Sequence, residues 1–131
     1  QEIAFTSDRG GSPQIYVIDA DGGNIRRLTN SGNYNTSASW SPRGDWVAYA
    51  CRNKGGFLKL CANRVSGQEE VHITEDGAWD DESPSWAPNG REIVFTSNRF
   101  GRDQIFVIRP DGTGLIQLTS NGGNSPAWAP R

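Results

Sequence analysis

Few of the residues that enzymes use for catalysis occur in this sequence. Its 131 residues include one His, His72, and no Met. No G-x-S-x-G motif is present, and a Ser-His-Asp triad needs a base beside an activated nucleophile. We therefore interpret His72 as a surface residue of an outer strand. We predict a protein that is not an enzyme and needs no cofactor.

An excess of charge and a long apolar segment are also missing. The 13 basic and 15 acidic residues give a net charge of −2 without a basic patch, so nucleic acid is not an expected partner. No apolar run approaches the roughly 18 residues that a membrane-spanning helix needs, so no membrane insertion is expected. With no initiating Met and no signal peptide, the sequence is interpreted as a processed product or a piece of something longer.

Cysteine is scarce as well. Cys51 and Cys61 are too few for a disulfide framework. The repeat described below places them on neighbouring strands of one hairpin. They are either a cross-strand disulfide, in an oxidising compartment, or two partly buried thiols. The sequence leaves both alternatives open. It does not fix the strand register, and the register decides whether the two sulfur atoms can form a bond.

What the sequence does contain is a repeat built around tryptophan. Residues 39–50, SWSPRGDWVAYA, return as residues 85–96, SWAPNGREIVFT. A third copy is divided between the two ends, with residues 127–131 as its first half and residues 1–6 as its second. Each copy joins a short Trp strand to a β-rich strand through a Pro-containing turn, which predicts a hairpin.

The spacing of this repeat predicts the fold. Trp40, Trp86 and Trp128 lie 46 and 42 residues apart, and four short strands in a period of about 40–45 residues are typical of a β-propeller blade. No stretch has helical periodicity, and a β-sandwich would not explain the repeat. We predict an all-β propeller with three four-stranded blades. Its units are residues 1–44, 45–90 and 91–131, with the C-terminal strand closing a blade begun by residues 1–7.

The tryptophans are expected to have two roles. Trp40, Trp86 and Trp128 recur once per unit, so they are predicted to pack one sheet on the next. Trp79 lies outside the repeat, in an acidic loop, and is expected to be exposed.

Several segments resemble the WD-like propeller repeats of the TolB family. They are PSWAPNG at residues 84–90, IAFTSDR at 3–9, IYVIDADGG at 15–23 and RLT at 27–29. Arg43, Asn89 and Arg131 depart from the pattern, since the family prefers Asp there. The resemblance covers essentially the whole chain.

The resemblance implies a module of a six-bladed ring in the bacterial envelope, hence a periplasmic location. It also implies protein partners, chiefly a peptidoglycan-associated lipoprotein, bound at the ring face. Related repeats form the propellers of serine oligopeptidases. Three units are half of such a ring, and closed propellers have roughly four to eight blades. We therefore predict a homodimer that completes six blades with two-fold symmetry.

The binding surface is expected on the loops of one propeller face, because loops on a rigid scaffold carry function. Tyr34 and Trp79 are aromatic in otherwise polar loops, as interface anchors are. Loops that merely connect strands are the alternative. The candidate ligand-binding residues are Tyr34, Asn35, Trp79, Asp80, Asp81, Glu82, Asn124, Arg9, Arg99 and Arg102.

No metal site is predicted. The segment 19–22, DADG, lacks the distal ligands of a calcium loop and suits a hairpin turn. Asp80, Asp81 and Glu82 are the better cation candidates, yet a run of acids in a loop is usually solvated.

Together these features predict a non-enzymatic, TolB-like propeller module that binds a protein, a peptide or a small ligand on its loop face. One alternative is a propeller fragment, natural or engineered, whose main property is self-assembly. A second is a propeller domain severed from a hydrolase or lyase.

Overall fold

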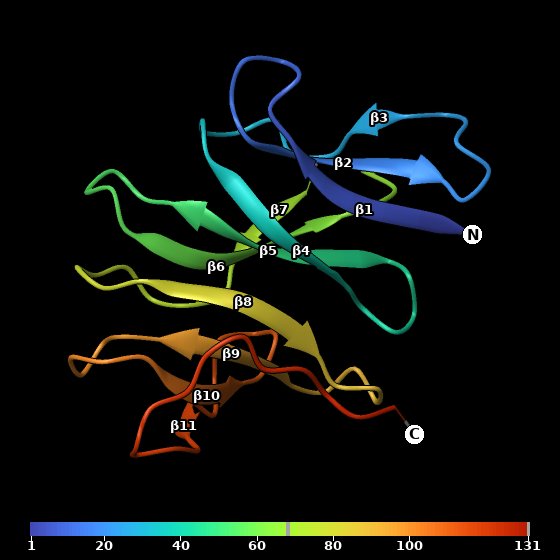
Figure 1. Ribbon diagram of the computed structural model, residues 1–131. Coiled ribbons are helices and arrows are strands. Elements are labelled where there is room, and N and C mark those ends of the chain that lie inside the picture. The colour runs from blue at the N-terminus through green and yellow to red at the C-terminus, as the bar shows by residue number, and fades with distance from the viewer. Residues whose placement is uncertain (68, 131) are drawn as a thin grey trace.

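The structure is a computed structural model that describes residues 1–67 and 69–130. These residues form eleven β-strands, joined by loops and turns, and no helix. The strands are β1 (Glu2–Ser7), β2 (Gln14–Asp19), β3 (Arg26–Arg27), β4 (Asn35–Trp40), β5 (Trp46–Arg52), β6 (Leu58–Arg64), β7 (Glu70–His72), β8 (Asp81–Trp86), β9 (Ile93–Ser97), β10 (Gln104–Ile108) and β11 (Ile116–Gln117). They form three antiparallel sheets, β1-β2-β3, β4-β5-β6-β7 and β8-β9-β10-β11, which follow one another from the N- to the C-terminal end (Figure 1).

The repeated turn explains why each Trp strand folds back as a hairpin. Gly44 donates its amide to the Ser41 carbonyl at 2.9 Å, and the Trp46 amide donates to Ser41 Oγ at 3.1 Å. Gly44 has φ 77° and Gly90, in the equivalent turn, φ 73°. Only glycine adopts this backbone region freely, so the glycine of the repeat closes the turn.

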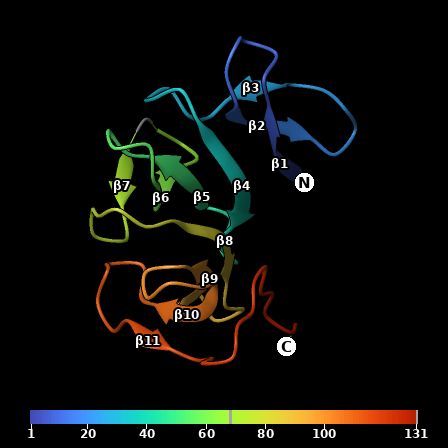
Figure 2. The same cartoon turned by 60° about the vertical axis from the view of Figure 1, so that its left-hand side comes forward.

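Two cores lie between the sheets, and β4 and β8 run beside each other on the inner side (Figure 2). The core between the first and second sheets is formed by Ile15, Val17, Leu28, Val47, Tyr49, Cys51 and Cys61. The core between the second and third is formed by Ala48, Leu60, Ala62, Ile73, Ile93, Phe95, Phe106 and Ile108. Alternate residues of β5 therefore face opposite sheets, as expected of a strand buried on both faces.

Four strands per blade were predicted. The first sheet of the chain has three strands, and the fourth strand of its blade was predicted to come from the C-terminal segment of a second copy. The prediction is confirmed for the other two sheets, whose inner strands β4 and β8 each bulge at a serine of positive φ, Ser37 (63°) and Ser83 (55°). Ser125 takes the same conformation, φ 52°, although no strand forms around it in the described residues. Its segment follows the third sheet as β8 follows the second: Trp128 N lies 3.5 Å from Ser85 Oγ, and Trp86 N 3.4 Å from Ser39 Oγ.

Burial of the tryptophans corrects two predictions. Trp40 and Trp86 are half-buried and pack on the two cores, as predicted for residues between sheets. Trp128 is 37% exposed, because the described residues form no further sheet beyond the third one. Trp79 is half-buried rather than exposed, because charged side chains enclose its ring.

The two cysteines form a disulfide with a Cα–Cα distance of 6.0 Å. Cys51 pairs with Lys59 in the register, and Cys61 with Tyr49, so the bridge crosses diagonally from β5 to β6. It faces the first sheet. The disulfide alternative for these two residues is therefore the correct one.

We expect Trp86→Ala to lower the free energy of unfolding by about 2 kcal/mol, below the 3–5 kcal/mol typical of a fully buried Trp. The side chain is only half-buried, yet it packs on the core between the second and third sheets. Urea denaturation followed by circular dichroism measures the change. Leu115→Ala, at an exposed position, is the control and should change stability by less than about 0.5 kcal/mol. Equal effects of the two substitutions would contradict this packing.

Candidate functional site

Five loops gather at one end of the sheets, and we call their residues, 8–13, 28–34, 53–57, 73–80 and 98–103, the loop rim. Hydrogen bonds connect consecutive loops. The Asn35 amide donates to the Pro13 carbonyl at 2.9 Å, and Asn53 Nδ2 donates to Asp76 Oδ1 at 2.6 Å. The Asp80 amide donates to Asn98 Oδ1 at 2.8 Å. Loops 53–57, 73–80 and 98–103 are thus tied to one another by hydrogen bonds.

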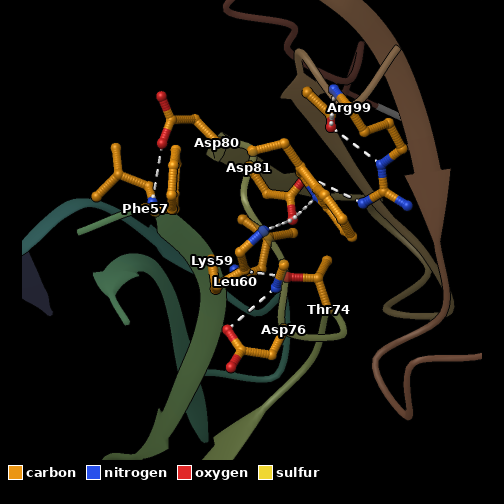
Figure 3. A network of polar contacts seen from close by, with 12 residues as sticks. Phe57, Lys59, Leu60, Thr74, Asp76, Asp80, Asp81 and Arg99 are labelled. Carbon is orange, nitrogen blue, oxygen red and sulfur yellow. Dashed lines mark hydrogen bonds and ion pairs between the residues drawn. The ribbon is translucent and has the colours of Figure 1, made fainter. Parts of the chain in front are cut away.

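A buried ionic cluster lies directly beneath the rim, between the second and third sheets (Figure 3). Asp81, at the start of β8, has no solvent exposure. Its carboxylate accepts a hydrogen bond from Arg99 Nη2 at 3.0 Å and another from Trp79 Nε1 at 3.1 Å, and it lies 3.5 Å from Lys59 Nζ. Three segments distant in sequence therefore converge on one carboxylate.

Trp79 compensates for the imbalance of one anion and two cations in this cluster. Its ring lies 4.0 Å from Lys59 Nζ and 5.1 Å from the Arg99 guanidinium carbon, so both cations face its π-electrons. Burial lowers the pKa of Lys59, while the charge of Asp81 acts in the opposite direction. The cluster holds the second sheet against the third and supports the rim loops from below.

The same position between the first and second sheets holds a neutral cluster. Gln14 and Lys59 are equivalent in the register, as are Asn35 and Asp81. Gln14 Oε1 accepts from Asn35 Nδ2 at 2.8 Å and from Thr29 Oγ1 at 2.7 Å. A Gln–Asn pair at one junction is thus replaced by a Lys–Asp pair at the next.

The candidate binding residues separate into internal and solvent-facing groups. Asn35 and Asp81 are buried, and the Arg99 side chain is nearly so. Asp80 accepts a hydrogen bond from the Leu58 amide at 3.0 Å, and burial raises the pKa of the half-buried Glu82. These side chains brace the loops. Asp81 is already paired with the two cations Lys59 and Arg99, so Asp80, Asp81 and Glu82 are unsuited to hold a metal cation.

The solvent-facing group contains arginines. Arg9, Arg102 and Asn124 are exposed. Tyr34 is half-buried beneath Arg52, whose guanidinium carbon lies 3.9 Å from the ring centroid. The Arg9 guanidinium carbon likewise lies 5.2 Å from the ring of Tyr16.

Sequence reasoning gave too little weight to Phe100 and missed Lys59. Phe100 is 73% exposed, the largest value among the exposed large hydrophobic residues of the described chain. It adjoins Arg99 on the rim, and an aromatic residue in a Gly-Arg-rich loop was the available signal. Lys59 lies within a strand, and only the comparison of repeat positions, Lys59–Asp81 with Gln14–Asn35, could have revealed it.

A hollow of about 510 Å³ opens between the second and third sheets at the end opposite the rim. Trp46, Val71 and Trp86 line it, together with Pro42 and Pro110. Its apolar walls would suit a small ligand better than a protein surface.

Antiparallel sheets packed face to face, with their inner strands side by side and their loops on a common rim, define this chain as a set of β-propeller blades. The chain belongs to the TolB β-propeller domain family, which matches residues 1–131. It is 40% identical over 127 residues to the Tol-Pal system protein TolB of Desulfosudis oleivorans, covering 92% of this chain and 27% of the relative. A TolB homolog of Chlorobaculum tepidum is 40% identical over 121 residues, with the same two coverages.

A solved structure agrees with the sequence relatives. The crystal structure of TolB from Acinetobacter baumannii superposes with a TM-score of 0.83 at 31% identity, over 100% of this chain and 35% of that one. The chain thus spans about a third or less of the proteins it matches here. TolB homologues are periplasmic, which agrees with the location implied by the resemblance. Among the described residues, no helix has the length and apolarity to cross a bilayer.

Proposed function

We propose that the loop rim is a protein-docking surface and that the chain acts by binding rather than by catalysis. The observation that carries the proposal is that this end of the sheets exposes Phe100 on the third sheet's loop, together with Arg9 and Arg52 of the first and second sheets, whose guanidinium groups are already ordered by stacking on rings. Interface hot spots are rich in aromatic residues and Arg. A stacked guanidinium loses less freedom on binding than a free side chain. The buried cluster around Asp81 keeps this surface rigid.

The partner is inferred to be another protein of the envelope. One relative carries the name Tol-Pal system protein TolB, which supports a component of that system, such as a peptidoglycan-associated lipoprotein. Acidic and apolar side chains of the partner would complement Arg9, Arg52 and Phe100. Catalysis is not proposed, because His72, the only His in the sequence, lies beside a disulfide and a carboxylate instead of a nucleophile.

Replacing Phe100 by Ala tests the docking surface. We expect about fivefold to tenfold weaker binding of a peptidoglycan-associated lipoprotein from the species of either relative, because a hot-spot truncation costs more than about 1 kcal/mol. Isothermal titration calorimetry with the 131-residue chain gives the dissociation constant. Ile25→Ala is the matched control, since Ile25 is exposed on the connection opposite the rim. Equal affinities of wild type and Phe100→Ala would rule out the rim around Phe100.

We further propose that two copies of the 131-residue chain complete a six-bladed ring, each supplying the missing inner strand of the other. The segment around Ser125 already has the backbone shape of β4 and β8. β1 pairs with β2 on one side only, so its inner edge is free. Transferring the registers of β4 with β5 and of β8 with β9 places Trp128 opposite Ile3 and Ala127 opposite Ala4 of the second copy.

A further inference from the structure

The disulfide of the second sheet is part of a three-residue cluster of metal-ligand side chains. Cys51 on β5, Cys61 on β6 and His72 on β7 present one sulfur or nitrogen atom each, all within 4.8 Å of one another. His72 is the direct register partner of Cys61, so the two side chains share one face of the sheet. We propose that reduction of the disulfide turns this cluster into a binding site for a thiophilic divalent metal, with Zn²⁺ as the best fit.

The distances suit tetrahedral zinc. Metal–sulfur bonds of about 2.3 Å and metal–nitrogen bonds of about 2.0 Å at a tetrahedral angle place sulfur and nitrogen about 3.5 Å apart. His72 Nδ1 lies 3.5 Å from Cys61 Sγ. The two thiolates must separate to roughly 3.8 Å by the same geometry. With the two Cα atoms 6.0 Å apart, side-chain rotation is enough to bring the sulfur atoms to this separation.

A carboxylate orients the imidazole. Glu70 Oε1 lies 3.4 Å from His72 Nε2, on the side of the ring away from the sulfurs. Tyr49 donates its hydroxyl to the other carboxylate oxygen, Oε2, at 3.1 Å and so fixes Glu70 in turn. A metal-binding His commonly donates its second ring nitrogen to a carboxylate, which sets the tautomer. Here that partner is already in place, with Nδ1 turned toward Cys61.

The site is accessible from solvent. Cys51, Glu70 and His72 line a hollow of about 600 Å³ next to the loop rim, and Cys61 lies behind them, fully buried. A metal ion can therefore enter through the hollow. Three protein ligands leave one coordination position for water, in a site whose floor is the core between the first and second sheets.

Comparison of equivalent positions in the three sheets shows that the propeller fold does not require this cluster. The register equivalents of Cys51, Cys61 and His72 are Ser7, Tyr16 and Arg27 in the first sheet, and Ser97, Phe106 and Gln117 in the third. Neither set could bind zinc. The three ligand types therefore occur together only in the second of the three described sheets, at positions where a blade accepts unrelated side chains.

The chemistry balances with a dithiol reductant. The reductant passes two electrons and two protons to the disulfide and becomes a disulfide itself, leaving two thiols on Cys51 and Cys61. Zinc binding then releases both thiol protons, because the thiolate is the ligand. The oxidised state links β5 to β6, whereas the metal-bound state links β5, β6 and β7.

Zinc titration of the reduced 131-residue chain tests the proposal. The protein is reduced, freed of reductant without air, and mixed with ZnCl₂ or CoCl₂. Native mass spectrometry should show one zinc per chain with the loss of two protons, and Co²⁺ should give the thiolate charge-transfer and tetrahedral absorption bands. The oxidised protein should bind neither ion. Uptake by the reduced wild type no greater than that by Cys61→Ser would overturn the proposal.

Variants outside the disulfide separate the metal site from its thiols. His72→Ala keeps both cysteines and should bind zinc more than about 100-fold more weakly, whereas Glu70→Gln should weaken binding about 10–100-fold. Glu69→Gln, at an exposed neighbouring carboxylate, is the matched control and should bind as wild type. If the reduced chain unfolds without metal, zinc must refold the wild type but not His72→Ala. The site would be refuted if His72→Ala bound zinc with wild-type affinity, or if zinc refolded His72→Ala as it refolds the wild type.

Discussion

Replacing Asp81 by Asn is expected to lower the free energy of unfolding by about 3–5 kcal/mol, because it leaves two buried cations without their shared anion. Asp81 is the carboxylate that Lys59 and Arg99 both contact, and neither cation has another carboxylate in its ion pairs within the described residues. Lys59 Nζ is buried without a hydrogen bond to any described residue, so Asp81 is its main compensation. Urea denaturation at neutral pH measures the loss.

The first junction of the chain supplies the control for this prediction. The double substitution Lys59→Gln with Asp81→Asn copies the Gln14–Asn35 pair, whose amide groups bond at 2.8 Å. Replacing a buried ion pair by a neutral one of similar shape is often nearly neutral for stability. The double variant should therefore regain the part of the stability that Asp81→Asn loses through Lys59, while Arg99 remains without its carboxylate. An Asp81→Asn protein as stable as wild type, or a double variant no more stable than the single one, would contradict the role of the cluster.

The periodic part of this protein could be predicted from sequence. The Trp–Pro–Gly repeat predicted hairpins, and the structure has them, with Gly44 and Gly90 in the positive-φ position of the turn. The order of the strands, and the four strands of the second and third sheets, followed from the same pattern, because each unit must bury both faces of its sheet against neighbours. The family was identified from the same residues, and the match to residues 1–131 confirms it.

The site was harder to predict, because it depends on contacts between units. Asp81 looked like a solvated loop acid, yet it is the buried centre of the cluster, since Lys59 of β6 and Arg99 of the loop after β9 both approach it. Trp79 looked like an exposed anchor for the same reason. The disulfide required the diagonal register of β5 and β6, which the sequence pattern leaves open. Residue type alone showed the chemistry available, and the packing decided which side chains face solvent.

Pairing of two copies is the second large effect that we expect. Wild-type chains should sediment at twice the single-chain mass of 14.3 kDa, and Leu118→Asp should sediment at the single-chain mass. Leu118 is 57% exposed, whereas its register equivalents Leu28 and Ile73 are 4% exposed because a neighbouring sheet covers each of them. A second copy would cover Leu118 in the same way, and a carboxylate there would be buried without a partner. Since Leu118 touches neither internal core, the variant should keep its fold.

The pairing also predicts which backbone bonds join the copies. Ile3, at the free edge of β1, is 52% exposed, whereas its equivalents Val47 and Ile93 are fully buried. Ala127 would add to this edge opposite Ala4, as Ser39 does opposite Ala48. Ala127→Pro removes the amide that such a ladder needs, so it should separate the copies while leaving the circular dichroism spectrum unchanged. A well-folded wild-type protein at the single-chain mass would exclude the pairing, and a dimer that survives Ala127→Pro would exclude the exchange of strands.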